Sequence, residues 1–188
     1  MTVRELAQVI GLFVAAFPGV LWGPLYYRHL EEVKISGLKS SKGEFEALVV
    51  LSTNAKKDLQ WWIDNIADSF YPLEISEPDC EICTDASMQG YGAVCGNEQI
   101  GGRWSEEEKR LHINALELLA IEYALKCLVH FINGKHIKIL CDNMCAVTYL
   151  NKMGGSHSAQ CNAIANRIWV WCKNRHIWLT VSHLPGKL

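Results

Sequence analysis

The character of the sequence changes near Asp79, and this change constrains the fold more than any other feature. Upstream, apolar residues recur at helical spacing and are interrupted by prolines and glycines, which predicts short helices. Downstream, short apolar runs alternate with glycines, which predicts antiparallel strands joined by tight turns. The three predicted strands cover 81–84, 92–95 and 100–104.

Helices and strands alternate after the third of these strands. The remaining predicted elements are a long helix over 106–131, a strand over 137–141, a short helix over 143–151, a helix after Ser158 and a last strand over 177–183. Ser158 is placed to cap the helix that follows it. The order βββαβααβ predicts an α/β domain with a mixed five-stranded sheet and helices packed on it.

The region before Asp79 divides into helices and a linker. Helices are predicted over 3–17 and 24–38 and from Thr53 onward, and the segment 71–79, with two prolines, is typical of a linker. The predicted organisation is therefore a helical segment (1–70), a linker (71–79) and an α/β domain (80–188).

An apolar run from residue 9 to residue 22 imitates a secretory signal peptide. Two features favour a buried helix instead. Thr2 and Glu5 have the spacing of a capping box that opens a helix, and Pro18 and Pro24 interrupt the run. We therefore expect a protein that is intracellular, not secreted, and not inserted in a membrane.

Composition narrows the class of protein further. The 188 residues are 49% hydrophobic and 20% charged, which are globular values, and the net charge of −2 argues against sequence-blind nucleic-acid binding through a basic field. All eight cysteines follow residue 79, mostly in apolar runs, and this favours reduced core cysteines. Two pairs, Cys80 and Cys83 and Cys141 and Cys145, have zinc-like spacing, but Cys80 and Cys83 would point to opposite faces of a strand.

Three carboxylates stand where burial should exclude them. Asp85 and Asp142 end predicted strands, and Glu117 lies in the most apolar part of the long helix. Taken singly, each aspartate fits a turn or cap, and Glu117 fits an ion pair across the sheet. Together they favour a hard cation, Mg²⁺ or Mn²⁺, of the kind that serves two-metal phosphoryl transfer.

The sequence motifs around these acids resemble those of the ribonuclease H family. The matching motifs are Thr84-Asp85-Ala86-Ser87, Asn114-Ala115-Leu116-Glu117-Leu118 and Cys141-Asp142-Asn143. Gly102-Arg103-Trp104-Ser105, Asn151-Lys152-Met153-Gly154-Gly155 and His183-Leu184-Pro185-Gly186 are similar to stretches of DIRS-type retrotransposon reverse transcriptases. In such polyproteins a thumb and tether, similar to residues 1–70, precede the ribonuclease H domain.

The resemblance implies endonucleolytic cleavage of RNA in an RNA–DNA hybrid, with Mg²⁺ or Mn²⁺ held by Asp85, Glu117 and Asp142. It implies that Asn114 contacts the minor groove of the hybrid. The weaker candidates for contacts with the nucleic-acid backbone are Ser87, Gln89 and Asn143. The implied partners are the hybrid and the polymerase domain of the parent polyprotein, with no membrane.

The sequence departs from the family pattern at its end. The family's fourth acidic residue is expected on a final helix after Pro185-Gly186, and the sequence ends at Leu188. We therefore expect weak or no cleavage from a fold without its final helix. The alternatives are a non-catalytic nucleic-acid-binding module and an inert remnant of a retroelement with the same fold. His183 precedes the turn, and we interpret it as structural.

Overall fold

The computed structural model describes residues 1–185. It forms two compact units, Met1–Ile75 and Ser76–Leu188, which are described separately below. The stretch after Pro185, where the resemblance predicts the fourth acidic residue, lies outside the described residues.

The first unit is helical. It contains α1 (Val3–Ala16), η1 (Phe17–Gly19), η2 (Gly23–Leu25), α2 (Arg28–Ser40) and α3 (Thr53–Asn65). The predicted capping box opens α1, because the backbone N–H of Glu5 donates to Thr2 Oγ1 (3.1 Å) and the Thr2 N–H donates to the Glu5 carboxylate (2.8 Å). Ser52 caps α3 in the same way, accepting a hydrogen bond from the backbone N–H of Ala55 at 3.1 Å.

The prediction that Pro24 opens the second long helix is wrong. Pro24 lies in the one-turn helix η2, and α2 begins at Arg28. Tyr27, which precedes it, has a non-helical backbone (φ −146°, ψ −9°). The indole N–H of Trp62 donates to the Tyr26 carbonyl at 2.8 Å, so this oxygen is satisfied by α3 without a continuous helix through residue 26.

The core of this unit forms around Leu6, Leu30 and Trp62, which are almost completely buried. Trp62 stacks on Phe13 with ring centroids 4.3 Å apart. Within the apolar run of residues 9–22, Ile10 and Val20 are buried and Leu12 and Val14 are exposed. No helix of residues 1–185 is long and apolar enough to cross a membrane.

The second unit is built on a five-stranded sheet. Its strands are β1 (Cys80–Ala86), β2 (Gly90–Cys95), β3 (Glu98–Arg103), β4 (His136–Cys141) and β5 (Trp178–His183). Their order is β3-β2-β1-β4-β5; β1, β2 and β3 pair antiparallel, whereas β4 pairs in parallel with both β1 and β5. The predicted mixed α/β sheet is therefore confirmed, although β1, β2 and β3 begin before their predicted bounds.

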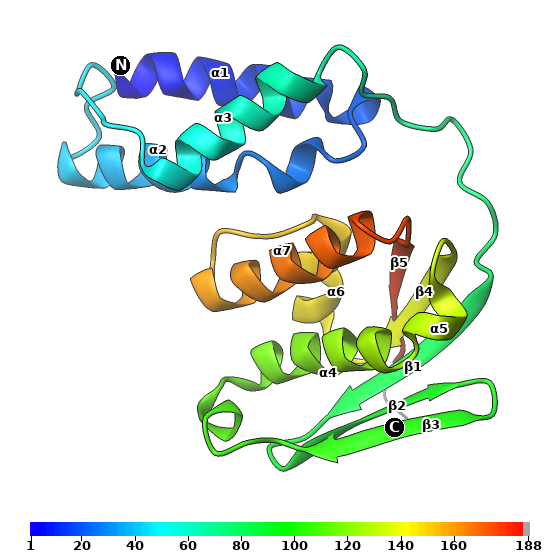
Figure 1. Ribbon diagram of the computed structural model, residues 1–188. Coiled ribbons are helices and arrows are strands. Elements are labelled where there is room, and N and C mark those ends of the chain that lie inside the picture. Colours follow the sequence, from blue (N-terminus) through cyan, green and yellow to red (C-terminus); the bar gives the residue numbers. More distant parts are fainter. Residues whose placement is uncertain (186–188) are drawn as a thin grey trace. The chain divides into compact units, whose positions relative to one another are not determined.

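Helices pack on this sheet. They are η3 (Glu108–Arg110), α4 (Ile113–Cys127), α5 (Val129–Ile132), α6 (Met144–Asn151) and α7 (Ala159–Lys173). Helix α4 lies against β1 and β2 and also contacts α7 (Figure 1). Successive side chains of a strand point to opposite faces of the sheet. Ile82 and Ile139 point to the buried face, whereas their neighbours Glu81 and Lys138 point to the other face and form a half-exposed ion pair at 2.9 Å.

The predicted long helix over 106–131 is wrong in its first and last turns. Ser105 and Glu108 cap one another (2.7 and 3.3 Å) and close the separate turn η3. Leu111 and His112 are then extended, and His112 caps α4 because its Nδ1 accepts the backbone N–H of Asn114 at 3.2 Å. Leu128 separates α4 from α5. These side-chain caps offer the backbone an alternative to a continuous helix.

Candidate active site

Glu117 lies on the inner face of α4, a helix with ten buried residues. Its side chain is only 3% exposed. The thiol of Cys141 donates to Glu117 Oε2 across 3.7 Å, and the backbone N–H of Ala86 also interacts with the carboxyl group. The glutamate therefore spans from α4 to the carboxyl ends of β1 and β4.

The Glu117 carboxyl group is electrostatically unusual. Burial, followed by the negative charges of Asp142 and Asp85, raises the pKa of Glu117 to about 7, against the lowering effect of hydrogen bonds from Cys141 and Ala86. A group with this pKa exchanges its proton near neutral pH. Such perturbation is a feature of functional sites that assemble like charges.

The two aspartates stand at neighbouring strand ends. Thr84 of β1 pairs with Cys141 of β4 in the parallel register, so Asp85 and Asp142 each follow one member of this pair. Both aspartates are exposed. Ligand atoms of Glu117, Cys141 and Asp142 all lie within 4.8 Å of one another. Asp85 is not part of this group, although its charge acts on Glu117.

Two predicted substrate residues contact each other beside this cluster. Asn143 caps α6, accepting the backbone N–H of Ala146 at 3.0 Å, and donates from Nδ2 to Asn114 Oδ1 at 3.0 Å. Asn114 lies one turn before Glu117 on α4. This bond therefore fixes the start of α4 against the start of α6.

The other two predicted substrate residues, Ser87 and Gln89, lie in the turn between β1 and β2. Ser87 Oγ accepts the backbone N–H groups of Gln89 and Gly90 at 3.2 Å and donates to the Gly90 carbonyl at 3.2 Å. Ser87 thus shapes its own turn. Both side chains are exposed, and the structure does not bring them into the cluster of ligand atoms.

Sequence reasoning gave Cys141 and Thr84 no role at the site, although both stand in the motifs around the aspartates. Cys141 is completely buried, burial raises the pKa of its thiol to about 12, and the Asn143 backbone N–H donates to its sulfur at 3.4 Å. Thr84 Oγ1 is buried without a hydrogen-bond partner among the described residues. The signal that would have found both is their position, immediately before each aspartate at the end of a buried strand.

These donors fit a divalent cation. Two carboxylates within reach of a common point suit Mg²⁺ or Mn²⁺, and Thr84, whose hydroxyl has no partner among residues 1–185, lies opposite Cys141 in the β1–β4 register. Cys141 is the one member of the group that Mg²⁺ does not favour. His183 lies at the same edge, with Nε2 3.0 Å from the backbone oxygen of Asp142.

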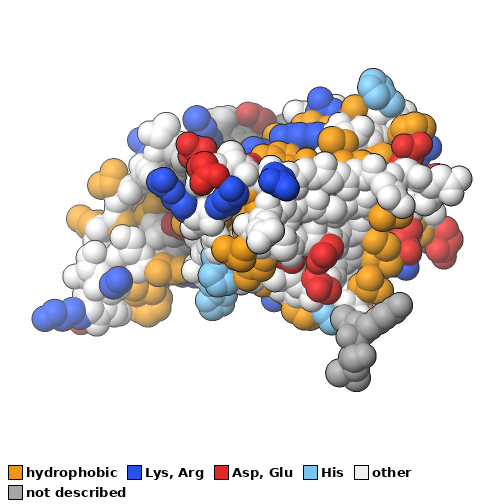
Figure 2. All heavy atoms as spheres, turned by 90° about the horizontal axis from the view of Figure 1, so that it is seen from below, with side chains coloured by type: hydrophobic (Ala, Val, Ile, Leu, Met, Phe, Trp, Pro, Cys, Tyr) orange, Lys and Arg blue, Asp and Glu red, His pale blue; other side chains and the backbone are white. Residues whose placement is uncertain are grey.

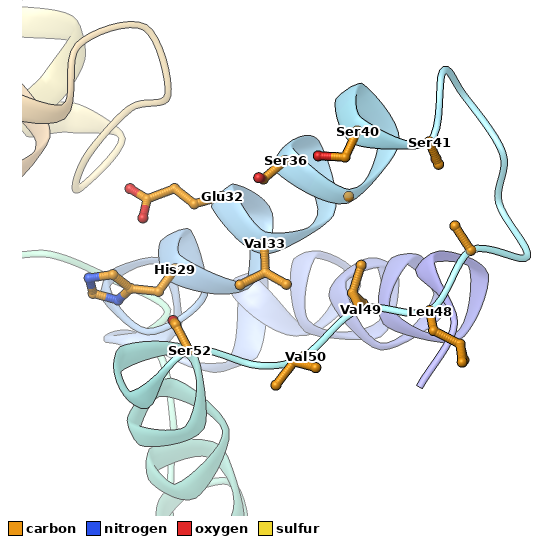
Figure 3. Close-up of a pocket in the computed structure, with 12 residues that line it drawn as sticks. His29, Glu32, Val33, Ser36, Ser40, Ser41, Leu48, Val49, Val50 and Ser52 are labelled. Carbon is orange, nitrogen blue, oxygen red and sulfur yellow. The ribbon is translucent and has the colours of Figure 1, made fainter.

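Two cavities lie outside the cluster. One, of about 630 Å³, is lined by Asn114 and by residues of α6 and of the start of α7, among them Tyr149 and Cys161. The other, of about 550 Å³, lies within the helical unit. There Glu32, Ser36 and Ser40 come from successive turns of α2, and the extended segment 48–50 lines the same cavity (Figure 3).

The segment beside the second cavity packs tightly on α2. A Cβ atom at Gly37 would lie 2.4 Å from Val49 Cγ1, so only glycine fits in this turn of the helix. His29 at the cavity's end contacts the buried carboxylate of Asp58, with Nδ1 3.0 Å from Oδ2. This cavity holds no group of carboxylates like that around Glu117 among the described residues.

Comparisons with solved structures return nuclease domains and reverse transcriptases. RNase H1 from the halophilic archaeon Halobacterium salinarum is 18% identical over 56% of this chain and 85% of its own, with a TM-score of 0.45. An RNase H1 isolated from compost is 17% identical over 58% of this chain and 86% of its own, with a TM-score of 0.47.

A foamy viral protease–reverse transcriptase in complex with double-stranded DNA is 14% identical over 100% of this chain, with a TM-score of 0.39. The chain spans 33% of that viral protein. No curated protein matches the chain. A family model described as an RNase H-like domain found in reverse transcriptase matches residues 76–172, more than half of the 188 residues. The chain belongs to this family of RNase H-like domains.

Proposed function

We propose that this protein carries a ribonuclease H-type site that hydrolyses the RNA strand of RNA–DNA hybrids with the help of Mg²⁺ or Mn²⁺, with only weak cleavage expected of the 188-residue chain. The observation that carries the proposal is the buried carboxyl group of Glu117, whose pKa of about 7 reflects burial and the charges of Asp142 and Asp85. A site that assembles three acids against their mutual repulsion is best explained by a cation that binds them.

Asp85, Glu117 and Asp142 are the residues that would hold the ion. A divalent cation in this place would stabilise the negative charge that develops on the phosphate oxygens during hydrolysis. Glu117 is fixed by its position on α4 and by its contact with Cys141, whereas the aspartates are exposed and can reach a phosphate. The protein thus supplies one rigid and two accessible carboxylates.

Recognition of the hybrid would use local donors rather than a basic field. Lys and Arg side chains appear only in scattered groups on the face drawn in Figure 2, and the net charge is −2. Hybrids are distinguished by groove shape and 2′-hydroxyl groups, for which amide side chains are suited. Asn114, which accepts a hydrogen bond from Asn143, would make such a contact, and Ser87 and Gln89 would contact the nucleic-acid backbone from the β1–β2 turn.

The test is cleavage of an end-labelled hybrid by the 188-residue chain in Mn²⁺ and in Mg²⁺. We expect Asp142→Asn and Asp85→Asn to reduce the cleavage rate by at least about 100-fold, because loss of charge stabilisation at a transition state has effects of this size. Glu98→Gln is the matched control, since Glu98 is an exposed acid on β3 away from the cluster.

Equal cleavage by Asp142→Asn and the unmodified chain would contradict the proposed site. Hybrid binding without cleavage in either ion would contradict the proposed activity and favour the non-catalytic binding module. Cleavage of single-stranded RNA at the same rate would contradict the proposed substrate.

We further propose that the parent protein is the reverse transcriptase of a DIRS-type retrotransposon. The support is the set of motifs in 102–105, 151–155 and 183–186 that resemble such elements. In this assignment residues 1–70 are the thumb and tether, 71–79 are the linker and the polymerase domain is the partner. The genomic DNA around the coding sequence tests it: polymerase motifs on the upstream side are expected, and an unrelated host gene there would refute it.

A further inference from the structure

Cys141 adds a thiol to the acidic cluster, and a thiol is not a ligand that Mg²⁺ prefers. It is the last residue of β4, and its sulfur lies 3.7 Å from Glu117 Oε2. Tetrahedral Zn²⁺ has bonds of about 2.3 Å to sulfur and about 2.0–2.2 Å to carboxylate oxygen, so two such ligands lie about 3.6 Å apart. The observed separation already matches that of two ligands of one zinc ion.

The third ligand is within reach. The ligand atoms of Glu117, Cys141 and Asp142 are all within 4.8 Å of one another, and Asp142 is the exposed member of the three. Cys₁Glu₁Asp₁ with a fourth open position is a donor set that suits a borderline cation better than a hard one.

We propose that Glu117, Cys141 and Asp142 bind a zinc-class divalent cation, with Cys141 as a thiolate ligand. The inference rests on the proposed function for the role of the two carboxylates and adds a second class of ion to the same site. Because the two classes share Glu117 and Asp142, Zn²⁺ competes with Mg²⁺ and Mn²⁺ and inhibits the proposed hydrolysis.

Thr84 provides an independent observation. It pairs with Cys141 in the β1–β4 register, so the two side chains lie on the same face of the sheet, the face covered by α4. The Thr84 side chain is more than nine-tenths buried, and Oγ1 has no hydrogen-bond partner among residues 1–185. A buried hydroxyl left unpaired is destabilising, and a polar ligand beside it would offset that cost.

The chemistry of binding is a proton exchange. The S–H bond of Cys141 breaks, a sulfur–metal bond forms, and the proton leaves to the solvent, with no change in oxidation state. The backbone N–H of Asn143, 3.4 Å from the sulfur, remains in place to donate to the thiolate. The thiol that donates to Glu117 in the absence of metal thus becomes a ligand beside it.

The test uses Cd²⁺ as a probe, because a cadmium–thiolate bond gives an ultraviolet charge-transfer absorption that needs no nucleic acid. We expect a stoichiometric absorption change that Zn²⁺ displaces. Cys141→Ser should weaken binding by more than about 100-fold, beyond the ~10–100-fold typical of removing a group that only orients a ligand. Cys127→Ser, which removes an exposed thiol at the end of α4, should leave it unchanged.

Cys80 and Cys95 are the competing thiols, because their side chains interact with each other across β1 and β2. Loss of the absorption change in Cys95→Ser, or its survival in Cys141→Ser, would overturn the proposal. Glu117→Gln is the second variant, and it should also weaken Cd²⁺ binding, which keeps the test open should Cys141→Ser unfold. Hybrid cleavage in Mg²⁺ is measured separately, so a failure of the thiolate site is distinguishable from a failure of the proposed hydrolysis.

Discussion

Glu117→Gln should make the metal-free protein more stable at neutral and alkaline pH. The substitution keeps the shape of the side chain and removes its charge. Burial, with the charges of Asp142 and Asp85, raises the pKa of Glu117 to about 7 from an ordinary value of 4.5. The folded state therefore holds the proton more tightly than the unfolded state, and its stability falls as pH rises from about 4.5 to about 7.

The size of the effect follows from this gap. One pKa unit corresponds to about 1.4 kcal/mol, so ionised Glu117 lowers the free energy of unfolding by about 3 kcal/mol above pH 7. Below pH 4.5 the group is protonated in both states, and the charge then contributes nothing. The advantage of Glu117→Gln should thus grow from near zero at pH 4 to about 3 kcal/mol at pH 8.

The assay is urea unfolding in a chelating buffer at pH 4, 6 and 8. Glu122→Gln is the matched control, because Glu122 is an equally buried glutamate on the same helix. Burial opposes ionisation of Glu122, but hydrogen bonds and charges from Arg167 and Lys126 hold its pKa below the usual value. The same substitution there should therefore lower stability at pH 8.

The direction of the stability change in the two variants tests whether Glu117 is held as a raised-pKa carboxyl group. If Glu117→Gln shows no pH-dependent gain over the unmodified chain, Glu117 is not held as a raised-pKa carboxyl and the electrostatic argument for the site is wrong. If both variants gain stability at pH 8, burial alone explains the data and the ion pair around Glu122 contributes nothing.

Three further outcomes are expected. Asn143→Ala should lower stability by about 1 kcal/mol through loss of the α6 cap, and it should weaken hybrid binding by releasing Asn114, as checked by unfolding and by filter binding. The hydrogen bond that the His29 ring donates to the Asp58 carboxylate raises the pKa of His29, so this pair stabilises the fold below pH 6.5 and less as pH rises through the raised value. His29→Gln should abolish that part of the pH dependence of unfolding. Trp62→Ala should cost about 3–5 kcal/mol in urea unfolding, because it removes a stacked, buried indole.

The fold was largely predictable because its local signals agree with one another. Ser158 precedes a segment in which apolar residues recur at helical spacing. It does cap α7, because its side chain accepts the backbone N–H of Cys161 at 3.2 Å. Gly96 separates β2 from β3 as expected, whereas the connection between β1 and β2 (residues 87–89) contains no glycine. The predicted strand order in the chain, with one long helix region between the third and fourth strands, leads to the observed mixed sheet.

The errors occur where side chains override periodicity. The acidic run at 106–108 has helical composition, yet Ser105 and Glu108 satisfy each other locally and close a separate turn. The start of α2 is displaced because the Trp62 indole satisfies the Tyr26 carbonyl from another helix. Tyr26 and Trp62 are 36 positions apart in the sequence, so no local sequence pattern predicts this hydrogen bond.

The sequence singles out the acids of the candidate site, but it does not single out the residues next to them. Aspartates at strand ends and a glutamate in an apolar helix are visible in one sequence, because burial makes charge conspicuous. Cys141 and Thr84 are not conspicuous, since both are ordinary residues for the end of a buried strand. Their importance depends on the register of β1 against β4, which only the structure provides.

The two buried glutamates of helix α4, Glu117 and Glu122, differ in the groups that surround their carboxylates. Glu122 is compensated: Arg167 and Lys126 both donate to its carboxylate. Glu117, five positions earlier, faces further acids instead, and the groups that contact it are a thiol and a backbone N–H. A chain that needed only a stable fold would gain about 3 kcal/mol at neutral pH by removing the Glu117 charge. A cation bound among Glu117, Asp142 and Asp85 would reverse that cost, and this is the physical reason for proposing a metal site at this glutamate.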